Sequence, residues 1–115
     1  MVKEEKKFLY KIEDEVLEIK LMGEIDHHSA VSVRADIDGL IFDLRPKKVV
    51  LDLSEISFMD SSGLGLIMGR YALIKDFGGT LSLRAPTVAV MKILTLAGME
   101  RMIKIEKSIK EEVKK

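Results

Sequence analysis

The sequence predicts a single α/β domain built on a mixed, mainly parallel β-sheet. Short apolar runs of strand character alternate with longer segments of helical spacing, and the first two strands follow each other with no helix between them. Strands joined by helices pair in parallel through right-handed crossovers, whereas two strands joined by a tight turn pair antiparallel. The expected order is β-β-α-β-α-β-α-β-α over residues 1–115, with four helices and a core at about 8–107.

The N-terminal part of the chain predicts an antiparallel hairpin followed by a helix. Apolar and polar residues alternate over 8–13 and again over 16–23, and the acidic residues at 13–15 suit a tight turn between the two strands. From Ala30 the apolar residues recur at helical spacing, until Pro46 prevents the helix from continuing. The apolar stripe of this helix comprises Ala30, Val33, Ile37, Leu40, Ile41 and Leu44.

The middle of the chain predicts a buried strand and a second helix. Residues 49–54, VVLDLS, are rich in β-branched residues and leucine, as expected of a central strand covered on both faces. A helix follows at about 62–77, and the glycine pair at 78–79 ends it. Its expected core positions are Leu64, Ile67, Met68, Tyr71 and Ile74.

The C-terminal part completes the alternation of strands and helices. Residues 80–85 alternate as a strand, and the Pro-Thr pair at 86–87 opens a third helix that Gly98 closes. A short strand at about 102–105 and a charged fourth helix at 108–115 end the chain. The third helix carries its apolar residues at Val88, Met91, Leu94 and Ala97.

The composition excludes several classes of protein. Apolar residues make up 47% of the chain and charged residues 33%, which is typical of a folded domain and unlike a disordered segment. Lys plus Arg and Asp plus Glu number 19 each, so the net charge of zero gives no global attraction to nucleic acid. The absence of cysteine excludes disulfides, thiolate catalysis and cysteine-rich zinc sites.

Localisation and cofactors can also be predicted. The sequence has neither a signal peptide nor a run of about 18 apolar residues that would span a membrane, so we expect a soluble, cytoplasmic protein. The stretch GLGLIMGR lacks the Gly-Lys-Ser/Thr ending of a phosphate-binding loop. No cofactor is therefore expected in this chain.

The stretch FMDSSGLG, residues 58–65, lies where the predicted central strand meets the second helix. In parallel sheets such junctions form the functional edge, because the unpaired N–H groups of helix N-termini gather there. Helix capping would use an oxygen of Asp60, Ser61 or Ser62, while the two glycines that follow would let the helix approach the sheet. A phosphoacceptor serine is the alternative, since a helix N-terminus stabilises a phosphate dianion.

Catalysis is a third interpretation of these serines. The stretch lacks the G-x-S-x-G nucleophile elbow, but a histidine of GEIDHHSA, residues 23–30, could approach Ser61 in space. We expect Asp26 to cap the first helix and to neighbour Ser61, because both lie at the same end of a parallel sheet. Adjacent residues such as His27 and His28 cannot both face one metal ion from a regular element, so no zinc site is expected.

Several stretches together resemble a known family. The segments GEIDHHSA, VVLDLSEISFMDSSGLGLIMGRY and APTVAVMKILTLAGMERMIKI, with the GG pair before residue 80, are similar to the STAS domain of bacterial anti-sigma factor antagonists. The resemblance extends from about Val16 to Ile105, and DHH together with FMDSSGLG points to the branch that opposes the sporulation anti-sigma F factor. The MERM segment departs from the more usual Gly-Leu type ending of the third helix.

The resemblance implies a partner-switching regulator that is not an enzyme. In that family the unmodified antagonist binds an anti-sigma factor that is also a serine kinase, which releases the sigma factor. The kinase inactivates the antagonist by phosphorylation with ATP, and a serine phosphatase restores it. Transferred by position, the phosphorylated residue is Ser61, and the free protein is expected to be a monomer. The implied partner-binding residues are Asp26, His27, His28, Asp60, Ser62, Gly63, Leu64 and Gly65.

Two other functions stay open as alternatives. Within the STAS fold, the chain could serve as a stressosome-like scaffold or as a weak nucleotide sensor. Outside that function class, Ser61 and His28 could form a small serine hydrolase. A scaffold would assemble into large particles, whereas a hydrolase would be labelled at Ser61 by a serine-directed phosphonate.

Overall fold

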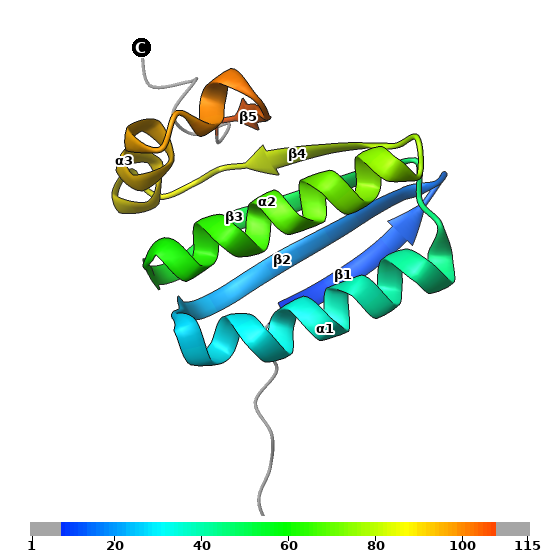
Figure 1. Ribbon diagram of the computed structural model, residues 1–115, viewed down its shortest axis with the longest axis horizontal. Coiled ribbons are helices and arrows are strands. Elements are labelled where there is room, and N and C mark those ends of the chain that lie inside the picture. Colours follow the sequence, from blue (N-terminus) through cyan, green and yellow to red (C-terminus); the bar gives the residue numbers. More distant parts are fainter. Residues whose placement is uncertain (1–7, 108–115) are drawn as a thin grey trace, which may run out of the picture.

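The computed structural model describes residues 8–107, which form five strands, three α-helices and a short 3-10 helix (Figure 1). The strands are β1 (Phe8–Glu13), β2 (Val16–Ile25), β3 (Lys48–Met59), β4 (Thr80–Arg84) and β5 (Lys104–Glu106). The helices are α1 (His27–Leu44), α2 (Ser61–Asp76) and α3 (Val88–Leu96), followed by the 3-10 helix η1 (Met99–Arg101). The model therefore shows three of the four predicted helices, and the fourth, at 108–115, lies outside the described residues.

The five strands form one sheet in the order β1-β2-β3-β4-β5. Strands β1 and β2 pair antiparallel, and every other neighbouring pair is parallel. Asp14 and Glu15 make the hairpin turn with φ values of 52° and 66°, the left-handed conformation that two-residue hairpin turns favour. The predicted fold class, with its N-terminal antiparallel hairpin, is confirmed.

Strand β3 is longer than predicted. It continues past residue 54 to Met59, because Ile56 and Met59 stay buried although polar residues interrupt the apolar run. Strand β2 extends beside it to Ile25, and the register between the two strands shifts twice along the way. The helices that follow begin earlier than predicted, α1 at His27 and α2 at Ser61, because the residues directly before them, Asp26 and Asp60, cap them.

Helices α1 and α2 lie side by side across one face of the sheet (Figure 1). The core between them and the sheet is aliphatic, and burying each Leu or Ile side chain contributes about 1.5–3 kcal/mol. Its fully buried members include Leu17, Ile19, Leu21, Ile37, Ile41, Leu51, Leu53, Ile67 and Ile74. The predicted stripe of α1 is buried except that Leu40 is half-buried and Leu44 is exposed.

The buried face of α2 differs from the predicted one. Ile67 and Ile74 are buried as expected, but Leu64, Met68 and Tyr71 are only partly buried against the core. The buried stripe is Gly63, Leu66, Ile67, Arg70 and Ile74. Apolar residues occur on almost every side of this helix, so their spacing alone does not identify the face that packs against the sheet. The buried face also includes a glycine and an arginine, which an apolar pattern does not reveal.

An ion pair joins the two helices. Arg70 of α2 is buried, and its Nε lies 2.8 Å from Oδ1 of Asp38 on α1. Burial lowers the pKa of Arg70, and the Asp38 carboxylate acts in the opposite direction. The guanidinium remains protonated at neutral pH, so Asp38 neutralises a charge that would otherwise be buried alone.

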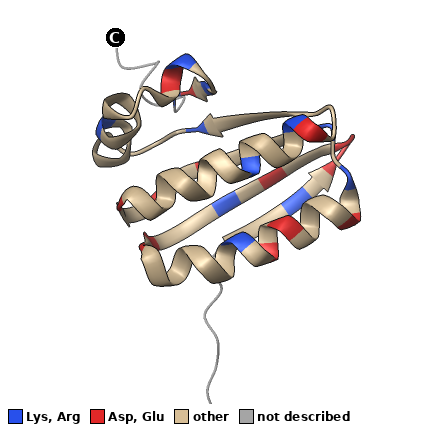
Figure 2. Cartoon of the chain, viewed as in Figure 1, with Lys and Arg blue, Asp and Glu red and all other residues tan. Residues whose placement is uncertain are grey.

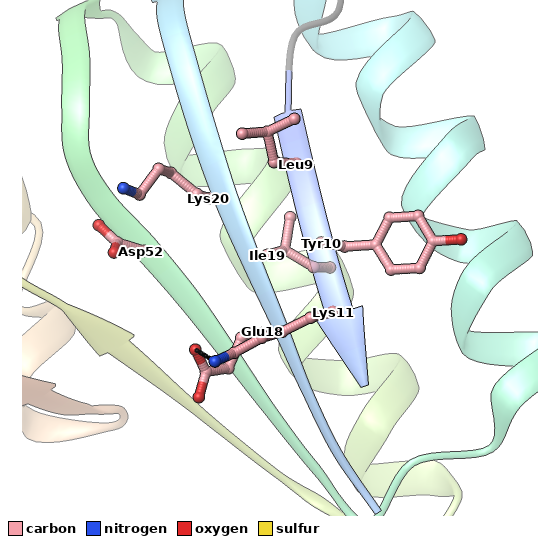
Figure 3. A pocket seen from close by; sticks show the side chains of 7 residues that line it. All are labelled: Leu9, Tyr10, Lys11, Glu18, Ile19, Lys20 and Asp52. Atoms are coloured by element: carbon pink, nitrogen blue, oxygen red, sulfur yellow. Dashed lines mark ion pairs between the residues drawn. The ribbon is translucent and has the colours of Figure 1, made fainter. Parts of the chain in front are cut away.

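The other face of the sheet carries charged side chains that pair across strands. Arg84 of β4 reaches Glu18 of β2 at 3.2 Å and Glu106 of β5 at 3.6 Å. Basic and acidic residues are interspersed over the molecule (Figure 2). A shallow pocket of about 320 Å³ lies near β1, where Lys11 pairs with Glu18 (Figure 3). It is lined by Leu9, Tyr10, Lys11, Glu18, Ile19, Lys20 and Asp52.

Replacing Asp38 tests the ion pair between the helices. Asp38→Ala leaves the buried Arg70 charge without its partner, so we expect a loss of about 1–3 kcal/mol in the free energy of unfolding. Urea unfolding measures this loss, and Asp36→Ala, an exposed change on the same helix, should stay within about 0.5 kcal/mol of the unmodified protein. Equal stability of the two variants would show that the pair adds nothing.

Candidate functional site

The parallel strands β2 and β3 end side by side and bring two helix N-termini together. Ile25 and Met59 are paired in the register, and the N–H of Asp60 donates to the carbonyl of Ile25 at 3.2 Å. Asp26 and Asp60 are the next residues and cap α1 and α2 respectively. The starts of both helices accordingly lie at the same edge of the sheet (Figure 1). This is the arrangement that the two polar sequence motifs predicted.

The N-terminus of α1 is held by a reciprocal capping box. The Asp26 carboxylate accepts from the N–H of Ser29 at 2.9 Å, and the Ser29 hydroxyl accepts from the N–H of Asp26 at 3.0 Å. The backbone N–H of Ser29 is the main cause of a lowered pKa at Asp26, helped by the Ser29 hydroxyl and by His28. Sequence analysis predicted Asp26 as the cap but missed Ser29, although the D-x-x-S spacing carries that signal.

At the start of α2 the cap is Asp60, one of the three candidates. Its carboxylate accepts from the N–H of Ser62 at 2.8 Å. Ser61 is the first residue of the helix and is exposed, whereas Ser62 is half-buried. The hydroxyl of Ser61 is therefore accessible to another protein, and capping does not depend on it.

The glycines of the motif differ in their surroundings. A Cβ at Gly63 would clash with the side chain of the buried Met59, so this glycine does let α2 approach the sheet. A Cβ at Gly65 or at Gly69 would meet no atom within 4 Å. The prediction that Gly65, like Gly63, lets the helix approach the sheet is therefore wrong, because a Cβ at Gly65 would point into open space.

A groove of about 250 Å³ runs between the first turns of α1 and α2. Its lining residues are His27, Ala30, Val31, Arg34, Ser62, Gly65 and Leu66. Three of them, His27, Ser62 and Gly65, are among the predicted partner-binding residues. Arg34 and the apolar residues were missed, because their sequence pattern is that of an ordinary helix surface. Leu64 packs partly against the core and does not line the groove.

The remaining predicted residues are sequence neighbours of those that line the groove. His28 is exposed on the first turn of α1, next to Asp26, and Asp60 precedes Ser61 at the start of α2. Within residues 8–107 no three His, Asp or Glu side chains are grouped as a metal site would require. In the same part of the chain, no helix combines the length and apolarity needed to cross a membrane.

Alanine at the two glycines should have opposite effects on stability. Gly63→Ala forces Met59 to move within a packed core, so we expect a loss of about 1–3 kcal/mol in the free energy of unfolding. Gly65→Ala meets no neighbour and replaces a helical glycine, so stability should rise by up to about 1 kcal/mol. Thermal melts compare the two, and a loss at Gly65 would contradict the open space described.

The Asp26 cap predicts a specific dependence of stability on pH. Because folding lowers the pKa of Asp26, its contribution is present above the ordinary value of about 3.9 and is lost as the pH falls through the lowered pKa. Asp26→Asn retains a capping oxygen but does not titrate. As the pH is lowered from about 5 to about 2, across the pKa range of aspartate, the free energy of unfolding should therefore fall less steeply in the variant than in the unmodified protein. Urea unfolding measures this difference. Parallel losses would exclude Asp26 as a contributor.

Comparisons with known proteins agree with this architecture. The family model described as STAS domain matches residues 7–112. An anti-sigma F factor antagonist of Paenibacillus polymyxa is 39% identical over 90 residues, which cover 78% of this chain and 77% of that protein. The chain is thus similar to a regulatory protein, in line with the expectation that it is not an enzyme.

Solved structures give the same result. The anti-sigma factor antagonist SpoIIAA in its unphosphorylated form superposes with a TM-score of 0.76 at 30% identity, covering 92% of each chain. The Bacillus cell fate determinant SpoIIAA in the phosphorylated form gives a TM-score of 0.69 at 29% identity, covering 92% of this chain and 96% of that one. The chain therefore belongs to the STAS domain family, and its relatives there are anti-sigma factor antagonists.

Proposed function

We propose that this protein is an anti-sigma factor antagonist that acts by switching partners. In its unmodified form it binds an anti-sigma factor at the edge formed by the N-termini of α1 and α2, and the sigma factor is released. The observation that carries the proposal is the exposed Ser61 at the start of α2, adjacent to the groove that Ser62 lines. The relatives named as anti-sigma F factor antagonists support a partner of the sporulation F type.

Phosphorylation of Ser61 is the proposed switch. A phosphate adds a charge of about −1.5 to −2 at a helix end that carries about half a positive charge, so the exposed position tolerates it. A partner packed over Ser61 would have to strip water from that dianion, which is costly. A difference of about 3 kcal/mol between the two forms changes the affinity about a hundredfold. The existence of SpoIIAA in phosphorylated and unphosphorylated forms supports this mechanism.

The identity of the modifying enzymes is part of the same proposal. We infer that the anti-sigma factor is itself the serine kinase and that it binds the ATP used in the reaction. A serine phosphatase would restore the unmodified protein. This chain would hold no cofactor and would act in the cytoplasm as a monomer when free. His27 lines the groove, and Asp26, His28 and Asp60, at the starts of the same two helices, are the further docking residues that we propose. No feature of residues 8–107 favours the scaffold, nucleotide-sensing or hydrolase alternatives over this function.

Variants of Ser61 test the switch. Ser61→Ala should bind the anti-sigma factor normally and resist phosphorylation, whereas Ser61→Asp and Ser61→Glu should bind about tenfold to a hundredfold more weakly, since a carboxylate carries less charge than a phosphate. Calorimetric titration measures affinity, and mass spectrometry after incubation with the kinase and ATP locates the phosphate.

The matched control places the same charge elsewhere on the surface. Ala72→Asp is an exposed change on α2 about three turns beyond Ser61, and it should leave binding unchanged. Circular dichroism establishes that every variant is folded. A phosphate on a residue other than Ser61, or full affinity of both acidic Ser61 variants, would contradict the proposed switch.

A further inference from the structure

We propose that Arg34 determines the specificity of the groove between α1 and α2 by pairing with a carboxylate of the bound anti-sigma factor. The partner segment would place an acidic side chain on Arg34 and an apolar side chain in the groove beside it. This inference rests on the proposed function and deepens it, because it names the chemistry that the partner must present.

The groove combines an apolar floor with one strong cation. Ala30 and Leu66 are buried at its base, Val31 is 51% exposed at its side, and the missing side chain of Gly65 leaves it open. Arg34 is the only Lys or Arg within α1, and no acidic residue lines the groove. An arginine that borders apolar surface is a preferred partner for a carboxylate at a protein interface.

The ion pair in the helix interface leaves the charge of Arg34 available. Asp38 lies one turn further along α1, where a carboxylate could pair with Arg34, but its Oδ1 is 2.8 Å from Nε of the buried Arg70. None of the ion pairs found within residues 8–107 includes Arg34. Burial is the main cause of the lowered pKa of Arg70, and the positive charge of Arg34 adds to it. A carboxylate docked on Arg34 would therefore meet a cation that takes part in none of the ion pairs found within residues 8–107.

The same cation offers a physical reason for the effect of phosphorylation. Ser62 lines the groove and Ser61 precedes it, so a phosphate on Ser61 brings a dianion to the rim of the surface that receives the partner's carboxylate. The phosphate repels that carboxylate and competes with it for Arg34. Modification would thus weaken binding through charge as well as through the cost of removing water.

Substitutions of Arg34 test the pairing. Because the side chain is exposed, the fold should tolerate them, and circular dichroism with thermal melts verifies this. Arg34→Glu should weaken binding to the anti-sigma factor by tenfold or more, and Arg34→Lys should retain affinity to within a few-fold. Lys75→Glu, the same charge reversal at an exposed position in the last turn of α2, should have no effect. Binding by Arg34→Glu equal to that of the unmodified protein would overturn the inference.

A double-mutant cycle tests the link with Ser61. If the introduced anion acts through Arg34, Ser61→Asp should cost several-fold less affinity in an Arg34→Gln background than alone. If Ser61→Asp lowers the affinity by the same factor in both backgrounds, Arg34 has no part in the switch. Failure of the unmodified protein to bind the anti-sigma factor at all contradicts the proposed function itself, so the two failures can be distinguished.

Discussion

The alignment of the ends of β2 and β3 is the constraint on which the candidate site depends. The register offset between the strands increases from 32 at Val16 and Lys48 to 34 at Ile25 and Met59, so β3 gains two residues through irregular pairing. Such bulges often occur next to functional sites, where they redirect side chains. Here they bring the two strand ends level, so that Asp26 and Asp60 start their helices together.

The packing of α1 on α2 determines which charged side chains near the site form ion pairs and which do not. A buried ion pair gives little net stability compared with apolar packing, because removing both charges from water is costly. The pair between Asp38 and Arg70 nevertheless fixes one helix against the other, and it engages the carboxylate that lies one turn from Arg34 on the same side of α1. A contact inside the helix interface therefore shapes the electrostatics of the groove on its surface.

The strand and helix order was predictable because each element shows its own period of apolar residues, and the helix caps were predictable because aspartate is a preferred N-cap. The end of β3 was not, since two shifts in its register with β2 interrupt the alternation that period counting requires. The buried face of α2 was missed because Arg70 is charged and lies inward only when Asp38 comes from another helix. The groove likewise depends on residues from two helices, so its lining cannot be obtained from either segment alone.

Because aspartate caps α2 and serine follows it, the helix start would be both stable and open to the proposed modification of Ser61. The Asp60 carboxylate accepts from the N–H of Ser62, so the helix is capped by a side chain that has no hydroxyl for a serine kinase to modify. Had the Ser61 hydroxyl been the cap, a phosphate would have replaced the acceptor on which the helix start depended. Because the cap lies one residue earlier, Ser61 occupies the first helical position with its hydroxyl exposed. The proposed phosphorylation of Ser61 would therefore leave the cap in place while it changes the charge of the surface presented to a partner.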